Sequence, residues 1–177
     1  PQADGTANYL LKTNGSAQLS WVQQTGKIVQ VKQGTIGALV SGSTAGPENS
    51  DSIPTNSQGF EVKTLAITPT SSTTRLFIYC CAAACGGVSG YSTLCLYQDS
   101  TSNAIASACT QNFAGGKSNA FTFFHDMVSG TTSETTFKLR YGAGPGSSTA
   151  YFNGDGGALR IHGGVLGSGI FILEYSA

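Results

Sequence analysis

The sequence predicts an all-β protein, an antiparallel jelly-roll sandwich preceded by a short extended connector. Gly supplies 24 of the 177 residues and charged residues only 10%, so good helix formers are scarce. Short apolar segments recur along the chain between loops rich in Gly, Ser and Thr, and none of them has a helical period. Roughly eight to ten strands at this spacing favour a jelly roll with one core of about 150 residues.

The expected strands follow one another from residue 27 onward. Parity changes near Lys63–Thr64, as it would at a β-bulge, and Pro69 ends that strand because proline cannot donate to a ladder. The polar segment Gln98–Thr101 is typical of a hairpin link between two of them. The predicted strands are Ile28–Val31, Phe60–Ile67, Arg75–Ala82, Tyr91–Tyr97, Ala104–Thr110, Ala120–Val128, Thr135–Tyr141, Ala150–Asn153 and Ile170–Tyr175. An immunoglobulin-type sandwich is the alternative, disfavoured because Trp21 lies outside the core and no cysteine pair brackets it.

Residues 1–26 differ in character from residues 27–177, which we expect to form the jelly-roll head domain. The first segment has turn residues around the short apolar pieces Tyr9–Leu11 and Leu19–Trp21. Two such pieces cannot close a core alone, so they need partner chains or a neighbouring domain. We therefore expect residues 1–26 to be an extended connector or stalk end.

The charge balance excludes two classes of partner. Nine Lys and Arg residues balance nine Asp and Glu residues, so the chain has no basic surface for nucleic acid or anionic lipid. The longest apolar run, Leu76–Cys85, is about ten residues, half of what a membrane-spanning helix requires. We expect neither a nucleic-acid partner nor membrane insertion.

The five cysteines form an odd set, and most of them lie inside apolar runs: Cys80, Cys81, Cys85, Cys95 and Cys109. This placement favours small buried hydrophobic side chains in a protein assembled in a reducing cytosol, rather than a disulfide framework. Zinc requires four ligands at turn-like spacing, and His125 and His162 are far away in sequence. We expect no metal and no cofactor.

Catalytic constellations are missing from the sequence. His125 and Asp126 are neighbours on a predicted strand, so their side chains point to opposite faces and cannot form a base and its orienting acid. His162 has no acidic residue close by, and the nine acidic residues are spread singly along the chain. The sequence therefore predicts a protein that is not an enzyme.

Several predicted strands are apolar on both faces, which a monomeric sandwich does not require. Ile170–Leu173, Leu76–Tyr79 and the group Phe121, Phe123 and Phe124 show this pattern. Self-association around a symmetry axis would cover the second face. The alternative is that these are central strands with loops folded over them. The candidate residues of a trimer interface are Phe121, Phe123, Phe171, Leu173 and Tyr175.

Aromatic residues also punctuate the polar loops and strand ends. Rings beside hydroxyl and amide groups suit the faces and hydroxyls of sugars. The alternative for each ring is that it closes one end of the sandwich. The candidate receptor-binding residues are Tyr91, Phe113, Tyr141, Tyr151 and His162.

The segment Gly5–Trp21, which reads GTANYLLKTNGSAQLSW, resembles a short element that recurs in tail-fibre and appendage proteins of bacteriophages, just upstream of a head domain. Residues 51–54, 65–70, 96–106 and 163–174 resemble phage virion proteins of the fibre type. The resemblance implies a trimeric jelly-roll head, similar in plan to complement C1q and tumour-necrosis-factor domains, on a virion appendage. It carries over no receptor-binding residue, and the cysteine-rich strand departs from it.

These observations lead us to expect a non-enzymatic virion fibre or spike protein, assembled in the host cytoplasm and exposed on the particle surface. Its head would be a homotrimer that binds a glycan or protein of the host surface, and residues 1–26 would join it to other virion proteins. One alternative is a capsid decoration or head-fibre structural protein. A second alternative is a carbohydrate-binding module of a larger enzyme.

Overall fold

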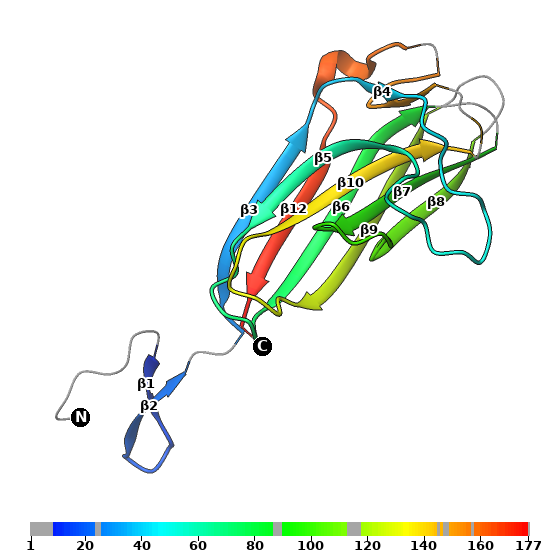
Figure 1. Ribbon diagram of the computed structural model, residues 1–177. Helices are drawn as coiled ribbons and strands as arrows, with labels where there is room; N and C mark the ends of the chain where they lie inside the picture. The colour runs from blue at the N-terminus through cyan, green and yellow to red at the C-terminus, as the bar shows by residue number, and fades with distance from the viewer. Residues whose placement is uncertain are drawn as a thin grey trace.

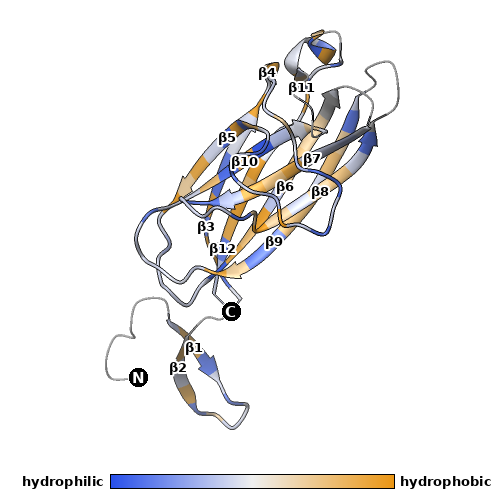
Figure 2. Ribbon diagram, turned by 45° about the vertical axis from the view of Figure 1, so that its right-hand side comes forward, coloured by the Kyte–Doolittle hydropathy of each residue, from blue (hydrophilic) through white to orange (hydrophobic). Residues whose placement is uncertain are grey.

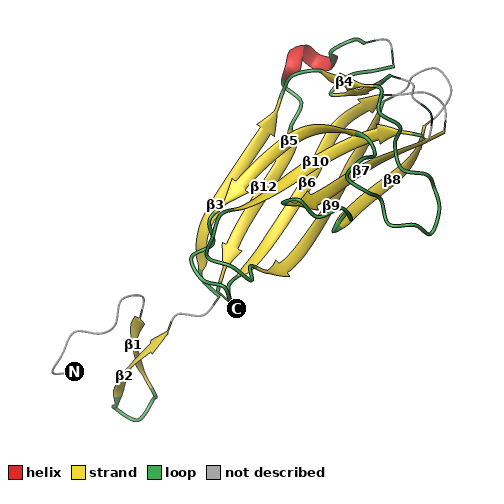
Figure 3. Ribbon diagram, viewed as in Figure 1, coloured by secondary structure: helices red, strands yellow, loops and turns green. Residues whose placement is uncertain are grey.

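Two β-sheets pack face to face in a sandwich, and a separate hairpin lies beyond the end where the chain finishes (Figure 1). The computed structural model describes residues 9–23, 26–86, 90–112, 118–144, 146, 149–156 and 158–176. Strands make up nearly all of its regular structure, and one short 3-10 helix, η1 (Ile161–Gly164), lies at the far end (Figure 3). Among the described residues no helix has the length and apolarity to cross a bilayer.

The strands are β1 (Tyr9–Thr13), β2 (Leu19–Gln23), β3 (Ile28–Ile36), β4 (Val40–Gly42), β5 (Phe60–Ile67), β6 (Arg75–Gly86), β7 (Gly90–Gln98), β8 (Ala106–Asn112), β9 (Asn119–Val128), β10 (Thr135–Ala143), β11 (Ala150–Phe152) and β12 (Ser168–Tyr175). Four antiparallel pairs are nested inside one another: β7 with β8, β6 with β9, β5 with β10, and β3 with β12. Successive pairs lie in alternate sheets, which is the connectivity of a jelly roll. The predicted fold class is confirmed.

The core lies between the four-stranded sheet β5-β10-β7-β8 and the sheet that contains β3, β12, β6 and β9. Figure 2 shows apolar and polar residues following one another along the strands. In β10, buried residues alternate with half-buried ones over residues 135–141, as the period of two in a strand requires. The fully buried side chains include Leu76, Ile78, Leu94, Leu96, Phe137, Leu139, Tyr141, Phe152, Ile170 and Ile172. Burial of these side chains supplies the main driving force for folding, about 1.5–3 kcal/mol for each large one.

Three details differ from the sequence-based expectations. The connector is not simply extended, because β1 and β2 pair as a hairpin whose turn is closed by Asn14. Residues 40–42 form strand β4, which pairs with β11, although residues 41–58 are expected to form a loop. The bulge in β5 falls at Val62, since Leu139 lies opposite Lys63 and Arg140 opposite Glu61. It lies within one residue of the predicted position.

The two ends of the sandwich differ. At one end the backbone of Gly26 and Lys27 is hydrogen-bonded to Ser176, so the strand that enters the head and the strand that leaves it lie together. The hairpin lies beyond this end, which we call the base (Figure 1). At the opposite end, the apical end, lie β4, β11 and η1. The head therefore presents loops at the end far from the hairpin.

Candidate functional site

One sheet face carries an unusual number of apolar side chains on its outside. Residues that lie opposite one another on paired strands point to the same face of the sheet. The core residues of β6 point inward, so the residues between them point outward, together with their partners on β12 and β9 and, through β12, on β3. We call this surface the outer apolar face, and its apolar members are Ile28, Val31, Phe77, Tyr79, Phe124, Val128, Phe171, Leu173 and Tyr175. Phe124 is 64% exposed, Ile28 56% and Val31 49%. Contiguous apolar surface of this kind is typical of an interaction site.

Contacts between side chains hold the aromatic part of this face in place. The ring of Phe124 stacks on that of Phe77, with centroids 5.5 Å apart. The hydroxyl of Thr122 donates to the Tyr79 hydroxyl over 2.8 Å. The rings therefore present an ordered surface, and covering it would cost little side-chain entropy.

A hollow of about 280 Å³ opens in the outer apolar face between Tyr79, Phe171 and Cys81. Gly169 lines this hollow, and its position requires glycine, because a Cβ atom there would lie 2.1 Å from the carbonyl oxygen of Gly34. The backbone φ of +152° at Gly169 also disfavours other residues. The exposed Phe124 ring and this hollow thus occur on one and the same face.

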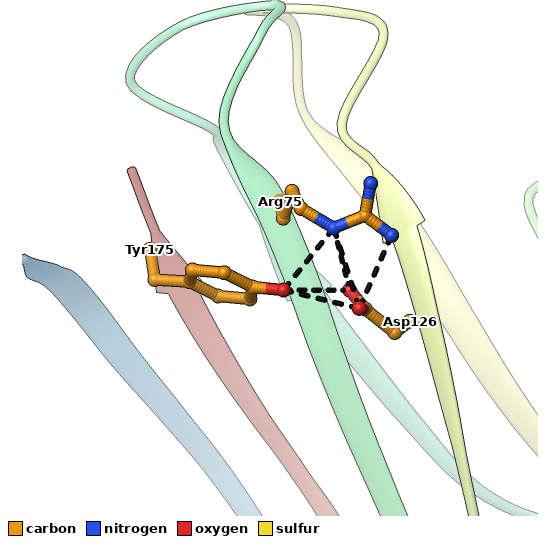
Figure 4. A network of polar contacts seen from close by, with 3 residues as sticks. All are labelled: Arg75, Asp126 and Tyr175. Carbon is orange, nitrogen blue, oxygen red and sulfur yellow. Dashed lines mark hydrogen bonds and ion pairs between the residues drawn. The ribbon is translucent and has the colours of Figure 1, made fainter. Parts of the chain in front are cut away.

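The polar part of the face is a three-residue network near the base (Figure 4). Arg75 forms an ion pair with Asp126, with Nη2 and Oδ2 3.1 Å apart. The Tyr175 hydroxyl donates to Asp126 over 3.0 Å, and Arg75 Nε donates to the Tyr175 hydroxyl over 3.1 Å. The hydrogen bonds to Asp126 and then to Tyr175 raise the pKa of Arg75. An exposed ion pair stabilises a monomer little, so this network matters mainly for what the face contacts.

The predicted interface residues divide between the two faces of their sheet. Phe171, Leu173 and Tyr175 point outward and are half-buried, on the outer apolar face. Phe121 and Phe123 point inward, where Phe121 belongs to the core and Phe123 packs against it. Their assignment to an interface is corrected, because they lie opposite the core residues Ala82 and Cys80.

The described members of the predicted receptor-binding set differ in burial and stand on different elements. Tyr141 is fully buried, with its ring among Phe60, Phe121 and Phe152, so its assignment to a receptor surface is corrected. Tyr91 and His162 are exposed and Tyr151 is half-buried. They stand on three different elements, β7, η1 and β11. Phe113 lies outside the described residues.

A buried acid stabilises the base of the same sheet. Glu174 is completely inaccessible to solvent, and its carboxylate accepts hydrogen bonds from the Thr70 backbone and hydroxyl, from Thr74 and from Gln30. Burial alone raises the pKa of Glu174, but these hydrogen bonds outweigh it and hold the pKa below its ordinary value. Glu174 is thus a structural anion, and its charge is already satisfied.

The side chains of four of the five cysteines are described, and all four are free thiols. Cys80 and Cys95 are buried, which raises the pKa of each thiol to about 12. Cys81 is half-buried on the outer apolar face, whereas Cys109 is exposed and departs from the expectation of buried cysteines. Among the described residues no group of His, Cys, Asp and Glu side chains is placed to hold a metal ion.

Comparison with known proteins finds distant likenesses only. No family model matches the chain, and no curated protein matches it. The C-terminal domain of EclA, a sugar-binding protein, is 14% identical with a TM-score of 0.37 over 86% of this chain and 96% of that one. Dimeric latent PorU from Porphyromonas gingivalis is 8% identical, with a TM-score of 0.35 over 96% of this chain and 18% of that one.

A third solved structure is the enzymatically active domain of tailspike protein 4 of bacteriophage CBA120. It is 12% identical, with a TM-score of 0.28 over 86% of this chain and 20% of that one. With TM-scores this low, none of these likenesses carries weight for the function of the chain. The function must be argued from the surface of the molecule itself.

Proposed function

We propose that the chain is a subunit of a homotrimeric, non-enzymatic head on a bacteriophage virion appendage, and that this head attaches the particle to glycans of the host surface. The observation that carries the proposal is the outer apolar face, where Phe124 is 64% exposed beside half-buried Phe77, Phe171 and Leu173. The chain has only nine charges of each sign among 177 residues to maintain its solubility. Exposure of this apolar face to water in a free monomer is therefore unfavourable.

Contact between copies is the cover that suits this face best. The face carries a protruding ring, Phe124, on strand β9, and a hollow beside Tyr79 and Phe171 toward β12. A protrusion and a hollow at different places on one face can each fit its counterpart on another copy, so contact between copies can cover this face. The number three follows from the resemblance of the sequence to trimeric jelly-roll heads.

The two ends of the molecule support a role on an appendage. The hairpin β1–β2 lies at the base, with Leu10, Leu19 and Trp21 exposed, and a two-stranded hairpin needs a partner for stability. The apical loops lie at the opposite end. In this proposal the base joins other virion proteins, and the rest of the head faces the host.

Two measurements test the proposal. Light scattering of the purified chain at micromolar concentration should give the mass of a trimer; a stable monomer would contradict the assembly. The isolated head should bind glycans on an array and compete with virions for host cells. A capsid decoration protein would instead bind empty capsids, occur in many copies per particle and leave the array blank.

A further inference from the structure

The four-stranded sheet has its own covered outer face, on the side of the molecule away from the outer apolar face. A long segment, residues 43–59, crosses it and is called here the covering loop (cyan in Figure 1). Tyr97 points outward on β7, opposite Lys138 of β10, yet it is only 1% exposed because the loop lies over it. Beside Tyr97 the loop leaves a pocket of about 350 Å³. We call this the loop pocket.

Hydrogen bonds to backbone oxygens fix the walls of the loop pocket. Tyr97 donates from its hydroxyl to the Thr55 carbonyl over 2.8 Å. Arg140 donates from Nε to the Gln58 carbonyl over 3.1 Å, and Asn56 donates from Nδ2 to the Thr101 carbonyl over 3.0 Å. The covering loop is thus tied to β7, to β10 and to the turn after β7. A pocket whose walls are already ordered loses little entropy when a ligand binds.

The charges that line the loop pocket balance. Glu61 and Asp99 are negative, and Lys138 and Arg140 are positive. The Asp99 carboxylate already has hydrogen-bond donors within the protein. One oxygen accepts a hydrogen bond from the Thr136 backbone amide over 2.7 Å, and the other accepts one from the Thr135 hydroxyl over 2.9 Å. The Arg140 guanidinium already donates a hydrogen bond to the backbone of the covering loop. Glu61 Oε1 accepts from the Thr64 hydroxyl over 2.5 Å. The groups left to face a ligand are therefore the ammonium of Lys138 and the second carboxylate oxygen of Glu61, Oε2.

This combination selects one class of ligand. An anion would meet the carboxylates of Glu61 and Asp99, and a cation would meet Lys138 and Arg140. An apolar ligand would leave the ammonium and carboxylate groups without partners. A neutral polyol satisfies both, since each of its hydroxyls can donate to a carboxylate and accept from an ammonium. The volume lies within the range of small-molecule sites.

We infer that the loop pocket binds one neutral sugar residue, whose hydroxyls donate to Glu61 and accept from Lys138, while Asn56 and Ser100 contact it at the rim. The inference rests on the proposed function for its biological role, because it places the glycan site of the head. It moves that site from the aromatic residues of the apical end to the side of the head. This side stays open when the outer apolar face is covered by neighbouring copies.

The location also fits attachment through many weak sites. Each copy of the head carries one loop pocket, and a trimer displays it on every side. Repetition can raise the overall affinity by about 10²- to 10⁴-fold over one site. A single pocket with few polar contacts is therefore sufficient for attachment.

The test combines binding and mapping on the intact chain. In the first measurement the probes are free glucose, galactose, mannose and N-acetylglucosamine, and their binding is detected by shifts of the backbone amide signals in NMR. In the second measurement the protein is applied to a glycan array. We expect shifts at residues 56, 61, 99–101 and 138. The variants Lys138→Met and Glu61→Gln should each weaken binding at least about tenfold, as the loss of a charge-assisted hydrogen bond predicts. Lys32→Met and Glu134→Gln change exposed residues elsewhere and should leave binding unchanged.

The outcomes separate this inference from the proposed function. If the wild-type head binds array glycans and folded Lys138→Met and Glu61→Gln variants bind them equally well, the loop pocket is not the site, and glycan attachment stands. If the wild-type trimer binds no sugar by either method, glycan attachment and the pocket both fail. Folding of each variant is checked by its thermal transition. Tyr91→Ala tests the apical end, and we expect this variant to bind sugar as the wild type does.

Discussion

Phe124 stacks on Phe77 on the outside of the sandwich, with ring centroids 5.5 Å apart and ring planes 23° apart. Stacked aromatic pairs are usual in protein cores, where they exclude water. Here the pair lies on strands β6 and β9 of the outer apolar face, and Phe124 is 64% exposed. The pair is therefore a pre-ordered contact surface, and its substitution is the sharpest test of assembly.

Phe124→Asp should dissociate the proposed trimer without unfolding the subunit. The loss of a central aromatic contact costs about 2 kcal/mol or more for each interface, whereas the monomer loses only the stacking, about 0.5–1.5 kcal/mol. Light scattering measures the mass, and circular dichroism checks the fold. Val165→Asp is the matched control, because Val165 is 86% exposed and lies near η1, away from the face. A variant at Phe124 that remains a trimer would contradict the interface.

Glu174→Ala should destabilise the head strongly. The substitution removes the acceptor of the Thr70 amide and hydroxyl, whereas the Thr74 hydroxyl keeps a second acceptor in the Ser71 carbonyl. Each buried group that stays unpaired costs about 1–3 kcal/mol. The change in the free energy of unfolding is measured by urea unfolding, followed by circular dichroism of the backbone. Glu134→Ala, at an exposed position in a turn, should change the stability by no more than about 0.5 kcal/mol.

Acid should weaken the wild-type head more than a Glu174→Gln variant. The pKa of Glu174 is lower in the folded state than its ordinary value, so its contribution to stability is complete above the ordinary value. The contribution is lost as the pH falls through the ordinary value toward the lower folded one. Unfolding midpoints measured between about pH 6 and pH 3 should therefore converge for the two proteins. Parallel curves would show that Glu174 does not titrate as described.

Gly142→Ala should loosen the covering loop. A Cβ atom at Gly142 would lie 2.5 Å from the Cα atom of Gly46, and contact between two backbones leaves no side chain to move aside. Overpacking of this kind costs about 1–3 kcal/mol. We expect a lower melting temperature and weaker sugar binding. Gly146→Ala has no atom within 4 Å of the new Cβ and should be neutral.

Thiol labelling should distinguish the cysteines by their burial. Cys109 is exposed and should react with iodoacetamide in the native protein. Cys80 and Cys95 should resist until the protein unfolds, because both are buried and their thiol pKa is raised to about 12. Cys81 lies on the outer apolar face, so it should react faster in the Phe124→Asp variant than in the trimer. Peptide mapping by mass spectrometry gives the order of reaction.

The fold was predictable because its signals are local. Pro69, the hairpin link Gln98–Thr101 and the period-two strands each identify an element without knowledge of its partners. Strand β4 was not predictable, because three residues, Val40–Gly42, carry too little pattern, and they pair only because β11 offers a free edge. The pairing of β1 with β2 was not predictable for the same reason, because their apolar segments are short.

The face that each residue occupies was harder to predict than its strand. Phe123 and Phe124 are consecutive aromatic residues, and only the pairing of Phe123 with the buried Cys80 shows which of the two points inward. Tyr141 looked like a surface ring next to a Gly-rich loop, but its hydroxyl is satisfied inside the core by Ser92. The loop pocket brings together Glu61, Tyr97 and Lys138, which no local spacing connects.

The nesting of the four strand pairs has a consequence for how the head is made. The innermost pair, β7 and β8, closes the shortest segment of chain, and each outer pair closes a longer one at a greater entropic cost. Among the strands of the sandwich, β3 is synthesised first and β12 last, so β3 lacks its main partner until all the other strands of the sandwich have been made. Until β12 is available, the unpaired edge of β3 is open to contact with other unfinished heads.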